Sequence, residues 1–250
     1  MGPVTLKGKT AVITGGSRGI GLAIARGMLD AGARVMIASR SQDSVDAAVD
    51  KLGAGACGFA ADVSKETDVA ALAEAAIGEL GAVDILVNNA GINPYYKRSE
   101  HTELAEWQHI IDVNLTGVFL CTRAIGQGML ERGKGAIVNI TSVAAHQGLT
   151  RGAAYCAAKA GVEAMSKSLT QDWAVRGVRV NNVAPGYVKT DLTAGLAAND
   201  ALRSEIEDRT PMARLATPEE MVGAVVFLAS DAASYVSGAT IAVDGGRIAT

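Results

Sequence analysis

Short apolar runs rich in β-branched residues alternate with longer amphipathic stretches along the whole chain. Strands that alternate with helices in this way are parallel neighbours, because a parallel pair needs a crossover connection. The pattern therefore predicts an α/β fold in which helices cover both faces of a parallel sheet. The predicted strands are Thr10–Thr14, Arg34–Ser39, Ala56–Ala61, Val83–Asn88, Gly135–Ser142, Val178–Ala184 and Ala239–Val243. The predicted helices lie near residues 19–32, 43–52, 65–80, 101–113, 115–132, 152–176 and 217–230.

The alternation continues without a linker rich in proline, glycine or serine, so residues 1–250 are expected to form a single domain. The segment from about residue 190 to 212 departs from it, because it is long for a connection and mixes apolar with charged residues. Long connections at the carboxyl ends of parallel strands commonly act as lids or binding loops. We therefore expect a substrate lid here. Its apolar residues recur at helical spacing, which favours contact with the core: Leu192, Leu196, Leu202 and Ile206.

Composition and charge narrow the class of protein. The 250 residues include 45 alanines and 29 glycines but only 4% aromatic residues, which indicates close contacts between helices and sheet. A net charge of −3 offers no attraction for nucleic acid or anionic membranes. Three scattered cysteines favour reduced thiols, and the sequence has no pattern of a secretory signal or a membrane span. We expect a cytoplasmic protein without nucleic acid, membrane or metal as a partner.

A glycine-rich turn directly follows the first predicted strand and opens the first predicted helix: Thr14-Gly15-Gly16-Ser17-Arg18-Gly19-Ile20-Gly21. Glycines let the backbone turn tightly and approach a pyrophosphate, whose charge is stabilised by the free N–H groups and the dipole of a helix N-terminus. A tight turn between a strand and a helix would use glycines as well. The position in the first βαβ unit favours dinucleotide binding.

The end of the second predicted strand bears on the choice between NAD and NADP. An NAD site usually places Asp or Glu there, roughly 20 residues after the glycine-rich turn. This chain has Ser39-Arg40-Ser41 instead. A guanidinium binds a 2′-phosphate through bidentate, charge-assisted hydrogen bonds, and Arg18 is a second candidate. We therefore expect NADP as the cofactor. NAD is the less favoured alternative, which applies if Arg40 is a solvated turn residue.

Chemistry-bearing residues gather in the middle of the chain. The fifth predicted strand ends in Ser142, and Tyr155 and Lys159 stand four residues apart on one face of the next predicted helix. A free tyrosine titrates near a pH of about 10, so its phenolate needs support at neutral pH. The neighbouring Lys159 ammonium, together with the positive ring of an oxidised nicotinamide, would supply it. The arrangement predicts an acid–base tyrosine whose pKa Lys159 lowers.

In their order along the chain, these motifs resemble the compact branch, of about 250 residues, of the short-chain dehydrogenase/reductase family. The resemblance covers essentially the whole sequence and implies a Rossmann-type, doubly wound parallel sheet with strand order 3-2-1-4-5-6-7. It also implies a homo-oligomer, commonly a tetramer or dimer. Further motifs that carry it are Asp62-Val63, Asn88-Asn89-Ala90-Gly91, Val113-Asn114-Leu115, Pro185-Gly186-Tyr187-Val188-Lys189-Thr190 and Val243-Asp244-Gly245-Gly246.

The resemblance implies roles for individual residues. Asp62 and Val63 would hold the adenine, Val188 and Thr190 would bind the carboxamide, and Asn88 would tie neighbouring strands. Four residues would be catalytic: Asn114 holding a relay water, Ser142 contacting the substrate oxygen, Tyr155 moving the proton and Lys159 binding the nicotinamide ribose. The cofactor would be bound by Gly15, Ser17, Arg18, Gly19, Ile20, Gly21, Arg40, Asp62, Val63, Asn89, Ala90, Gly91, Tyr155, Lys159, Val188 and Thr190.

The implied activity is hydride transfer between NADP and a carbonyl or secondary alcohol. The spacing of Tyr155 and Lys159 argues against the enoyl-reductase branch, which uses a longer interval. Ser39-Arg40 and Gly91-Ile92-Asn93-Pro94 most resemble gluconate 5-dehydrogenases, which favours a sugar acid or another polar ketone as substrate. The alternatives are a reductase of 3-oxoacyl thioesters and, in another class, a catalytically silent NADP-binding or sensing protein.

One loop offers charge for the substrate. Lys97 and Arg98 follow two tyrosines just after the fourth predicted strand. Two cations in a loop that lines the predicted substrate pocket would suit an anionic substrate. A solvated loop with its rings packed on neighbouring helices is an equally good interpretation.

Overall fold

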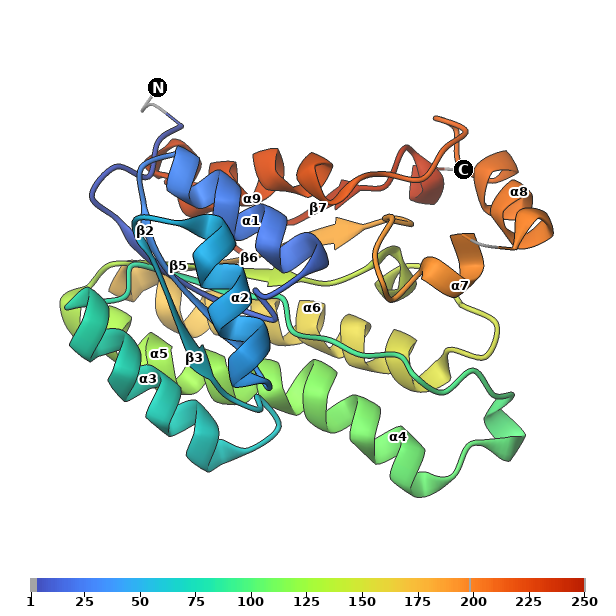
Figure 1. Cartoon of the computed structure of the whole chain (residues 1–250), viewed down its shortest axis with the longest axis horizontal. Helices are drawn as coiled ribbons and strands as arrows, with labels where there is room; N and C mark the ends of the chain where they lie inside the picture. Colours follow the sequence, from blue (N-terminus) through green and yellow to red (C-terminus); the bar gives the residue numbers. More distant parts are fainter. Residues whose placement is uncertain (1–3, 198, 250) are drawn as a thin grey trace.

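All seven predicted strands form one parallel sheet in the computed structural model, which describes residues 4–197 and 199–249 (Figure 1). The order β3-β2-β1-β4-β5-β6-β7 confirms the order that the resemblance implied. The predicted strand ends are correct to within two residues. The strands are β1 (Thr10–Thr14), β2 (Arg34–Ser39), β3 (Ala56–Ala60), β4 (Ile85–Asn88), β5 (Gly135–Ile140), β6 (Val178–Pro185) and β7 (Thr240–Val243).

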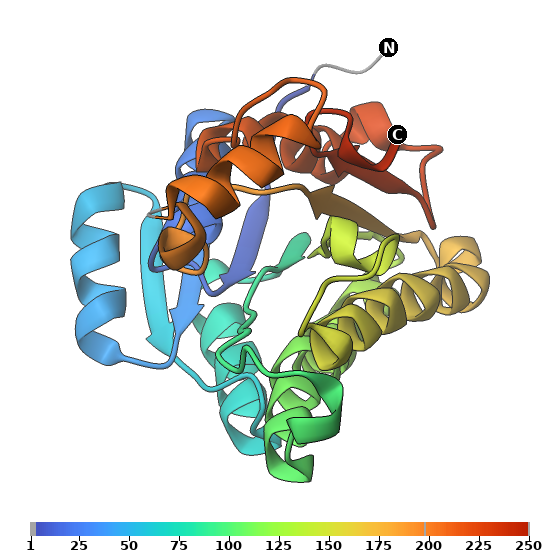
Figure 2. The ribbon, with the colours of Figure 1, turned by 90° about the vertical axis from the view of Figure 1, so that its right-hand side faces the viewer.

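Helices cover both faces of the sheet (Figures 1 and 2). One face carries α1 (Gly19–Asp30), α2 (Gln42–Leu52) and α9 (Val222–Ala229), and the other carries α3 (Glu66–Leu80), α5 (Gly117–Arg132) and α6 (Ala153–Trp173). Successive strand residues point to opposite faces. Ile13 and Ile37 therefore belong to the core beneath α1 and α9, whereas Val12 and Met36 belong to the core beneath α3 and α5. Burial on both sides explains why the strands are apolar throughout rather than alternating.

A π-helical turn interrupts the helical segment that the sequence predicted as two helices. It spans Asp112–Thr116 and joins α4 (Leu104–Ile111) directly to α5. Such turns occur frequently at functional sites. This one contains Asn114, whose side chain is fully buried.

Three asparagines lie at the same register on three adjacent strands. Asn88 on β4 donates to Asn139 on β5 over 2.8 Å, and Asn139 donates to Asn182 on β6 over 3.3 Å. Ser166 of α6 donates to Asn182 over 2.7 Å. Buried amides are stable only when they are paired, so these contacts hold the strands and α6 in one relative position. The prediction that Asn88 ties neighbouring strands is confirmed.

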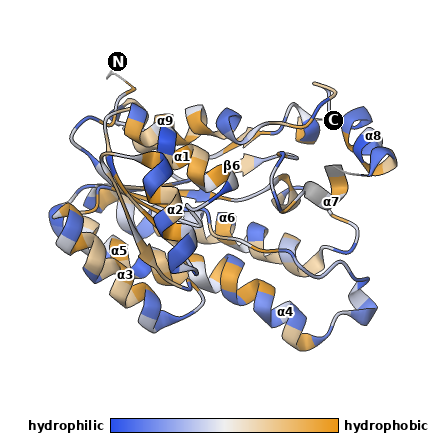
Figure 3. Cartoon of the chain, in the orientation of Figure 1, coloured by the Kyte–Doolittle hydropathy of each residue, from blue (hydrophilic) through white to orange (hydrophobic). Residues whose placement is uncertain are grey.

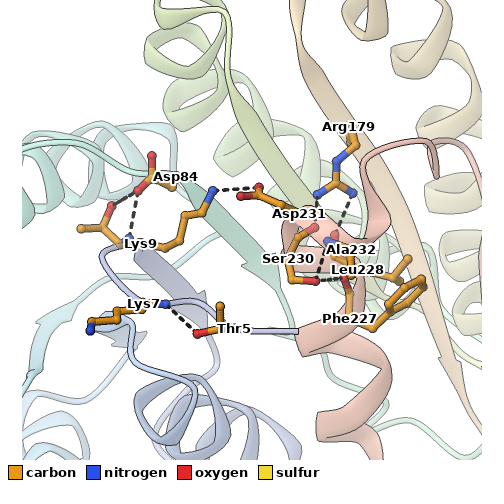
Figure 4. A network of polar contacts seen from close by, with 11 residues as sticks. Thr5, Lys7, Lys9, Asp84, Arg179, Phe227, Leu228, Ser230, Asp231 and Ala232 are labelled. Atoms are coloured by element: carbon orange, nitrogen blue, oxygen red, sulfur yellow. Dashed lines mark hydrogen bonds and ion pairs between the residues drawn. The ribbon is translucent and has the colours of Figure 1, made fainter. Parts of the chain in front are cut away.

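The amino end of the sheet is held by a separate polar network (Figure 4). Lys9 forms an ion pair with Asp231 at 2.9 Å, and this hydrogen bond holds the pKa of the Asp231 carboxyl below its ordinary value. Arg179 donates to the carbonyl oxygens of Leu228 at 2.8 Å and Ser230 at 3.1 Å. These contacts join segments near both ends of the chain. The residues predicted to be functional follow the opposite, carboxyl ends of the strands.

The segment predicted as a lid folds into two short helices, α7 (Ala194–Ala197) and α8 (Asp200–Asp208), while residue 198 lies outside the described residues. Figures 1 and 3 show α8 as a largely hydrophilic helix beyond the end of the sheet. Within the described part of the chain, no helix has both the length and the apolarity needed to cross a membrane.

The predicted contact of the lid's apolar residues with the core is wrong for two of them. Leu192 is 54% exposed and Leu202 is 37% exposed, whereas Ile206 is buried. Helical spacing places residues on one face but does not decide what that face meets. Because α8 lies beyond the sheet, its neighbour is the C-terminal turn, where Arg247 donates to the Ile206 carbonyl over 3.1 Å.

Candidate active site

A cleft of about 600 Å³ lies at the carboxyl ends of the strands, the side seen in Figure 2. Ligands of doubly wound sheets bind at this edge, where the strand order reverses, here between β1 and β4. Two predicted site residues, Gly21 and Asn114, do not line the cleft but contact its wall from behind. The other predicted site residues all line it: Gly15, Ser17, Arg18, Gly19, Ile20, Arg40, Asp62, Val63, Asn89, Ala90, Gly91, Ser142, Tyr155, Lys159, Val188 and Thr190.

The glycine-rich turn packs tightly on the loop that follows β4. Gly15 has φ +64°, and a Cβ there would lie 2.9 Å from Cα of Ala90. A Cβ on Gly21 would lie 2.2 Å from the Gly15 carbonyl oxygen, so Gly21 allows α1 to pack on the turn. The side-chain amide of Asn89 donates to the Gly15 carbonyl over 3.0 Å. These contacts hold the start of α1, at Gly19, against the cleft, where its free N–H groups suit a pyrophosphate.

Two carboxylates and two arginines line the far end of the cleft: Asp62, Asp191, Arg18 and Arg40. Burial acts to raise the pKa of Asp62, but hydrogen bonds from Ser64 and the nearby charge of Arg40 hold it below its ordinary value. Arg18 forms an ion pair with Asp191 of the lid segment at 3.1 Å, and both side chains are exposed. An exposed pair of this kind contributes little stability, so Arg18 can exchange Asp191 for another anion at small cost.

Three side chains converge at the opposite end of the cleft. Ser142 lies two residues beyond the end of β5 and hydrogen-bonds to the Tyr155 hydroxyl, which comes from the first turn of α6. Lys159, one turn further along α6, donates to the Ile140 carbonyl over 2.9 Å. Its Nζ lies 5.7 Å from the centroid of the Tyr155 ring. The three residues predicted to act together are therefore neighbours in space.

The electrostatics of these residues differ from the prediction. Burial raises the pKa of Tyr155 to about 12, although the hydrogen bond with Ser142 opposes this increase. Burial lowers the pKa of Lys159 to about 8. The prediction that Lys159 lowers the pKa of Tyr155 is wrong for the chain by itself, because desolvation dominates and Nζ is directed to the Ile140 carbonyl. Tyr155 is thus fully protonated at neutral pH.

The pKa of Lys159 predicts a pH-dependent stability. Its value of about 8 lies below the ordinary 10.5, so the unfolded chain binds more protons between these pH values. The free energy of unfolding must then rise with pH across this window. Between pH 8 and 10, we expect the wild type to gain about 2 kcal/mol relative to Lys159→Met. Urea unfolding at a series of pH values measures this difference, and parallel curves for the two proteins would contradict it.

Asn114 stabilises the loop that forms one wall of the cleft. Its amide nitrogen donates to the carbonyl oxygens of Ile92 at 2.8 Å and Ile110 at 3.0 Å, and its oxygen accepts from the Ile92 N–H at 3.0 Å. A Cβ on Gly91 would lie 2.7 Å from Oδ1 of Asn114 and 3.5 Å from Nζ of Lys159. Asn114 is thus adjacent to the predicted catalytic group, and its role in a proton relay stays a prediction.

The sequence analysis missed a buried glutamate that holds both sides of Ser142. Glu163, one turn beyond Lys159 on α6, accepts from the Thr141 hydroxyl at 2.9 Å and lies 3.2 Å from Nε2 of His146. Thr141 precedes Ser142 in the chain and His146 follows it, so the two contacts of Glu163 fix the position of the serine relative to α6. The only signal in the sequence is the four-residue spacing of Glu163 from Lys159.

Leu149 and Tyr187, to which the sequence analysis gave no role, also line the cleft. Leu192 of the predicted lid lines it as well. No group of three or more His, Cys, Asp or Glu that could hold a metal ion occurs among residues 4–197 and 199–249.

This chain is similar to known proteins over nearly its full length. A family model described as Enoyl-(Acyl carrier protein) reductase matches residues 15–247. A cis-4-hydroxycyclohexanecarboxylate dehydrogenase from Sinomonas cyclohexanicum is 43% identical, over 96% of this chain and 97% of that protein. A 3-oxoacyl-(acyl-carrier-protein) reductase from Vibrio cholerae is 42% identical, over 97% of this chain and 98% of that protein. The crystal structure of a gluconate 5-dehydrogenase from Burkholderia cenocepacia, in complex with NADP and tartrate, superposes with a TM-score of 0.94 at 37% identity and covers 99% of this chain and 98% of that one.

Proposed function

Because this chain belongs to the short-chain dehydrogenase/reductase family, we propose that it is an NADP-dependent oxidoreductase acting on a carbonyl or secondary alcohol. The observation that carries the proposal is the convergence of Ser142, Tyr155 and Lys159 at one end of a cleft whose other side is the glycine-rich turn. A cofactor-sensing protein without activity would not require this group of side chains.

The residues present fit NADP. Gly15 and Gly91 line the cleft at points where a Cβ would collide with neighbouring protein atoms, so their backbone is open to the cleft, and α1 begins there. Arg40 and Arg18 supply cations for a 2′-phosphate, and no carboxylate occupies the end of β2, where an NAD site would have one. When bound, the cofactor would supply or accept the hydride. The NADP in the Burkholderia cenocepacia structure supports this choice.

The side chains of this chain would move the proton. In the reduction direction, Tyr155 donates its proton to the carbonyl oxygen, and its high pKa keeps it protonated until that step. The Ser142 hydroxyl donates a hydrogen bond to the same oxygen and stabilises the charge that develops there. Lys159 would bind the nicotinamide ribose. In the oxidation direction, the cations of Lys159 and of oxidised nicotinamide would favour the phenolate of Tyr155.

For the substrate, we propose a sugar acid or another polar ketone. The two dehydrogenases named above, one for a hydroxycyclohexanecarboxylate and one for gluconate, support a hydroxy acid. The similarity to the Vibrio cholerae enzyme keeps a 3-oxoacyl thioester as the second candidate. Neither of these activities is enoyl reduction, and the three-residue interval between Tyr155 and Lys159 argues against it as well.

The test is NADPH oxidation with a panel of 5-keto-D-gluconate, 4-oxocyclohexanecarboxylate and an acetoacetyl thioester. We expect turnover with at least one keto acid and a higher kcat/KM than with the thioester. The opposite order would favour the thioester reductase. Absence of turnover with every compound, with NADPH and with NADH, would contradict the proposed enzyme.

We also propose that the enzyme is a homo-oligomer and works in the cytoplasm. Leu104 is 79% exposed and Phe119 is 43% exposed, both on the helical segment of α4 and α5, which suits pairing with another copy in a homo-oligomer. The three cysteines are free thiols, which suits the reducing cytoplasm.

A further inference from the structure

A second cavity, of about 310 Å³, adjoins the candidate active site. It lies between the loop after β4 and the start of α6, and Trp107 and Ile110 of α4 form part of its wall. Asn93 and Tyr155 line both this cavity and the cleft. A ligand bound beside Tyr155 in the cleft therefore has a second space next to it.

One cation lines this second cavity. Arg151 lies just before α6, four residues ahead of Tyr155. Its guanidinium stands over the Tyr96 ring, 5.5 Å from the centroid. Within the described ranges 4–197 and 199–249, Arg151 forms no ion pair with a carboxylate. Its charge is thus available to an anionic ligand.

The loop cations considered from the sequence are less suited to this role. Lys97 forms an ion pair with Glu106 at 2.6 Å, so its charge is already compensated. Arg98 lines neither cavity. The geometry therefore favours Arg151, rather than the two loop cations, as the group that binds an anion.

The backbone at Arg151 is strained. Its φ is +60°, and among the described residues only Ala213 shares a positive φ without being glycine. This conformation is unfavourable for a residue with a Cβ, whereas glycine adopts it readily. Strain of this kind is typical of functional positions, where the side chain compensates for it.

Asn93 provides a second polar group at the junction of the two cavities. Its Oδ1 is buried and has no hydrogen-bond partner among the described residues. An unpaired buried acceptor is destabilising. Because protein atoms cover Oδ1, a ligand hydroxyl could pair with it only if the side chain turned toward the junction.

We propose that the second cavity is a carboxylate subsite and that the substrate is a hydroxy acid whose carboxylate is remote from the reacting carbon. Arg151 binds the carboxylate through paired, charge-assisted hydrogen bonds. Trp107 and Ile110, which line the cavity, contact the carbon skeleton. The inference rests on the proposed function and names its substrate class.

The test compares an acid with an uncharged analogue. Arg151→Gly removes the guanidinium and also relieves the backbone strain, so the fold is retained. For oxidation of cis-4-hydroxycyclohexanecarboxylate with NADP, we expect KM to rise about tenfold or more with little change in kcat. The kcat/KM for the methyl ester should stay at the wild-type value. Arg98→Gln is the matched control and should change neither. Equal losses for acid and ester, or an unchanged KM for the acid, would overturn the subsite.

A binding measurement separates this inference from the proposed function. Calorimetric titration of cyclohexanecarboxylate into the NADP-saturated protein needs no turnover. Tighter binding of this acid than of its methyl ester, lost in Arg151→Gly, would support the subsite even if neither alcohol were oxidised, a result that would count against the proposed function. Oxidation of the ester without any preference for the acid, in binding or in turnover, would overturn the subsite and leave the proposed function standing.

Discussion

Replacing Tyr155 with phenylalanine is expected to lower kcat by about three orders of magnitude or more while NADP still binds. Positioned proton transfer contributes roughly 10²- to 10⁴-fold to a rate, and phenylalanine has no proton to give. The ring would still pack against the buried residues of α4 and α6, so the fold should be unchanged. The rate of NADPH oxidation with the keto acid that is reduced fastest measures the fall in kcat. The thermal shift on adding NADP measures whether the cofactor still binds.

The matched control for this variant is Cys156→Ala. Cys156 adjoins Tyr155 in sequence, but its thiol is directed to the Gln147 carbonyl, 3.9 Å away, and it does not line the cleft. We expect this variant to retain the wild-type rate. A phenylalanine variant that turns over at near the wild-type rate would refute the role of Tyr155, whereas loss of NADP binding would show that the substitution had damaged the site as a whole.

Replacing Arg40 with aspartate is expected to weaken NADP binding by about 100-fold and to leave NAD binding equal or stronger. A loss of 100-fold corresponds to about 2.7 kcal/mol, the size expected for paired hydrogen bonds between a guanidinium and a phosphate. Aspartate would repel the phosphate and accept hydrogen bonds from a ribose diol. Calorimetric Kd values for NADP and NAD, measured for this variant and for the wild type, give the change.

Two further variants sharpen the cofactor assignment. Arg18→Gln should weaken NADP binding less than Arg40→Asp, because Arg18 must leave Asp191 before it can contact the phosphate. Arg176→Gln, an exposed arginine outside the cleft, controls for loss of charge alone and should leave both affinities unchanged. A wild type that binds NAD more tightly than NADP would overturn the assignment.

The strands and most of the helices were predictable because their signals are local. A parallel strand buried on both faces needs an uninterrupted run such as Thr10–Thr14, and the helices between strands repeat apolar residues at helical spacing. The glycine-rich turn and the pair Tyr155 and Lys159 were recognisable for the same reason, since their spacing along the chain determines their spacing in the structure. The lid residues Leu192 and Leu202 were misjudged because their exposure depends on what lies opposite them.

The sequence by itself determined the order of the elements, the glycine-rich turn and the residue types at the candidate site. Only the tertiary structure decided their environment. The burial of Tyr155 and Lys159, which moves their pKa values in opposite directions, depends on how α6 packs against β5. The cavity beside Arg151 likewise depends on α4, the β4 loop and α6 meeting in space. Desolvation and cavity shape are created by residues distant along the chain, so no local pattern encodes them.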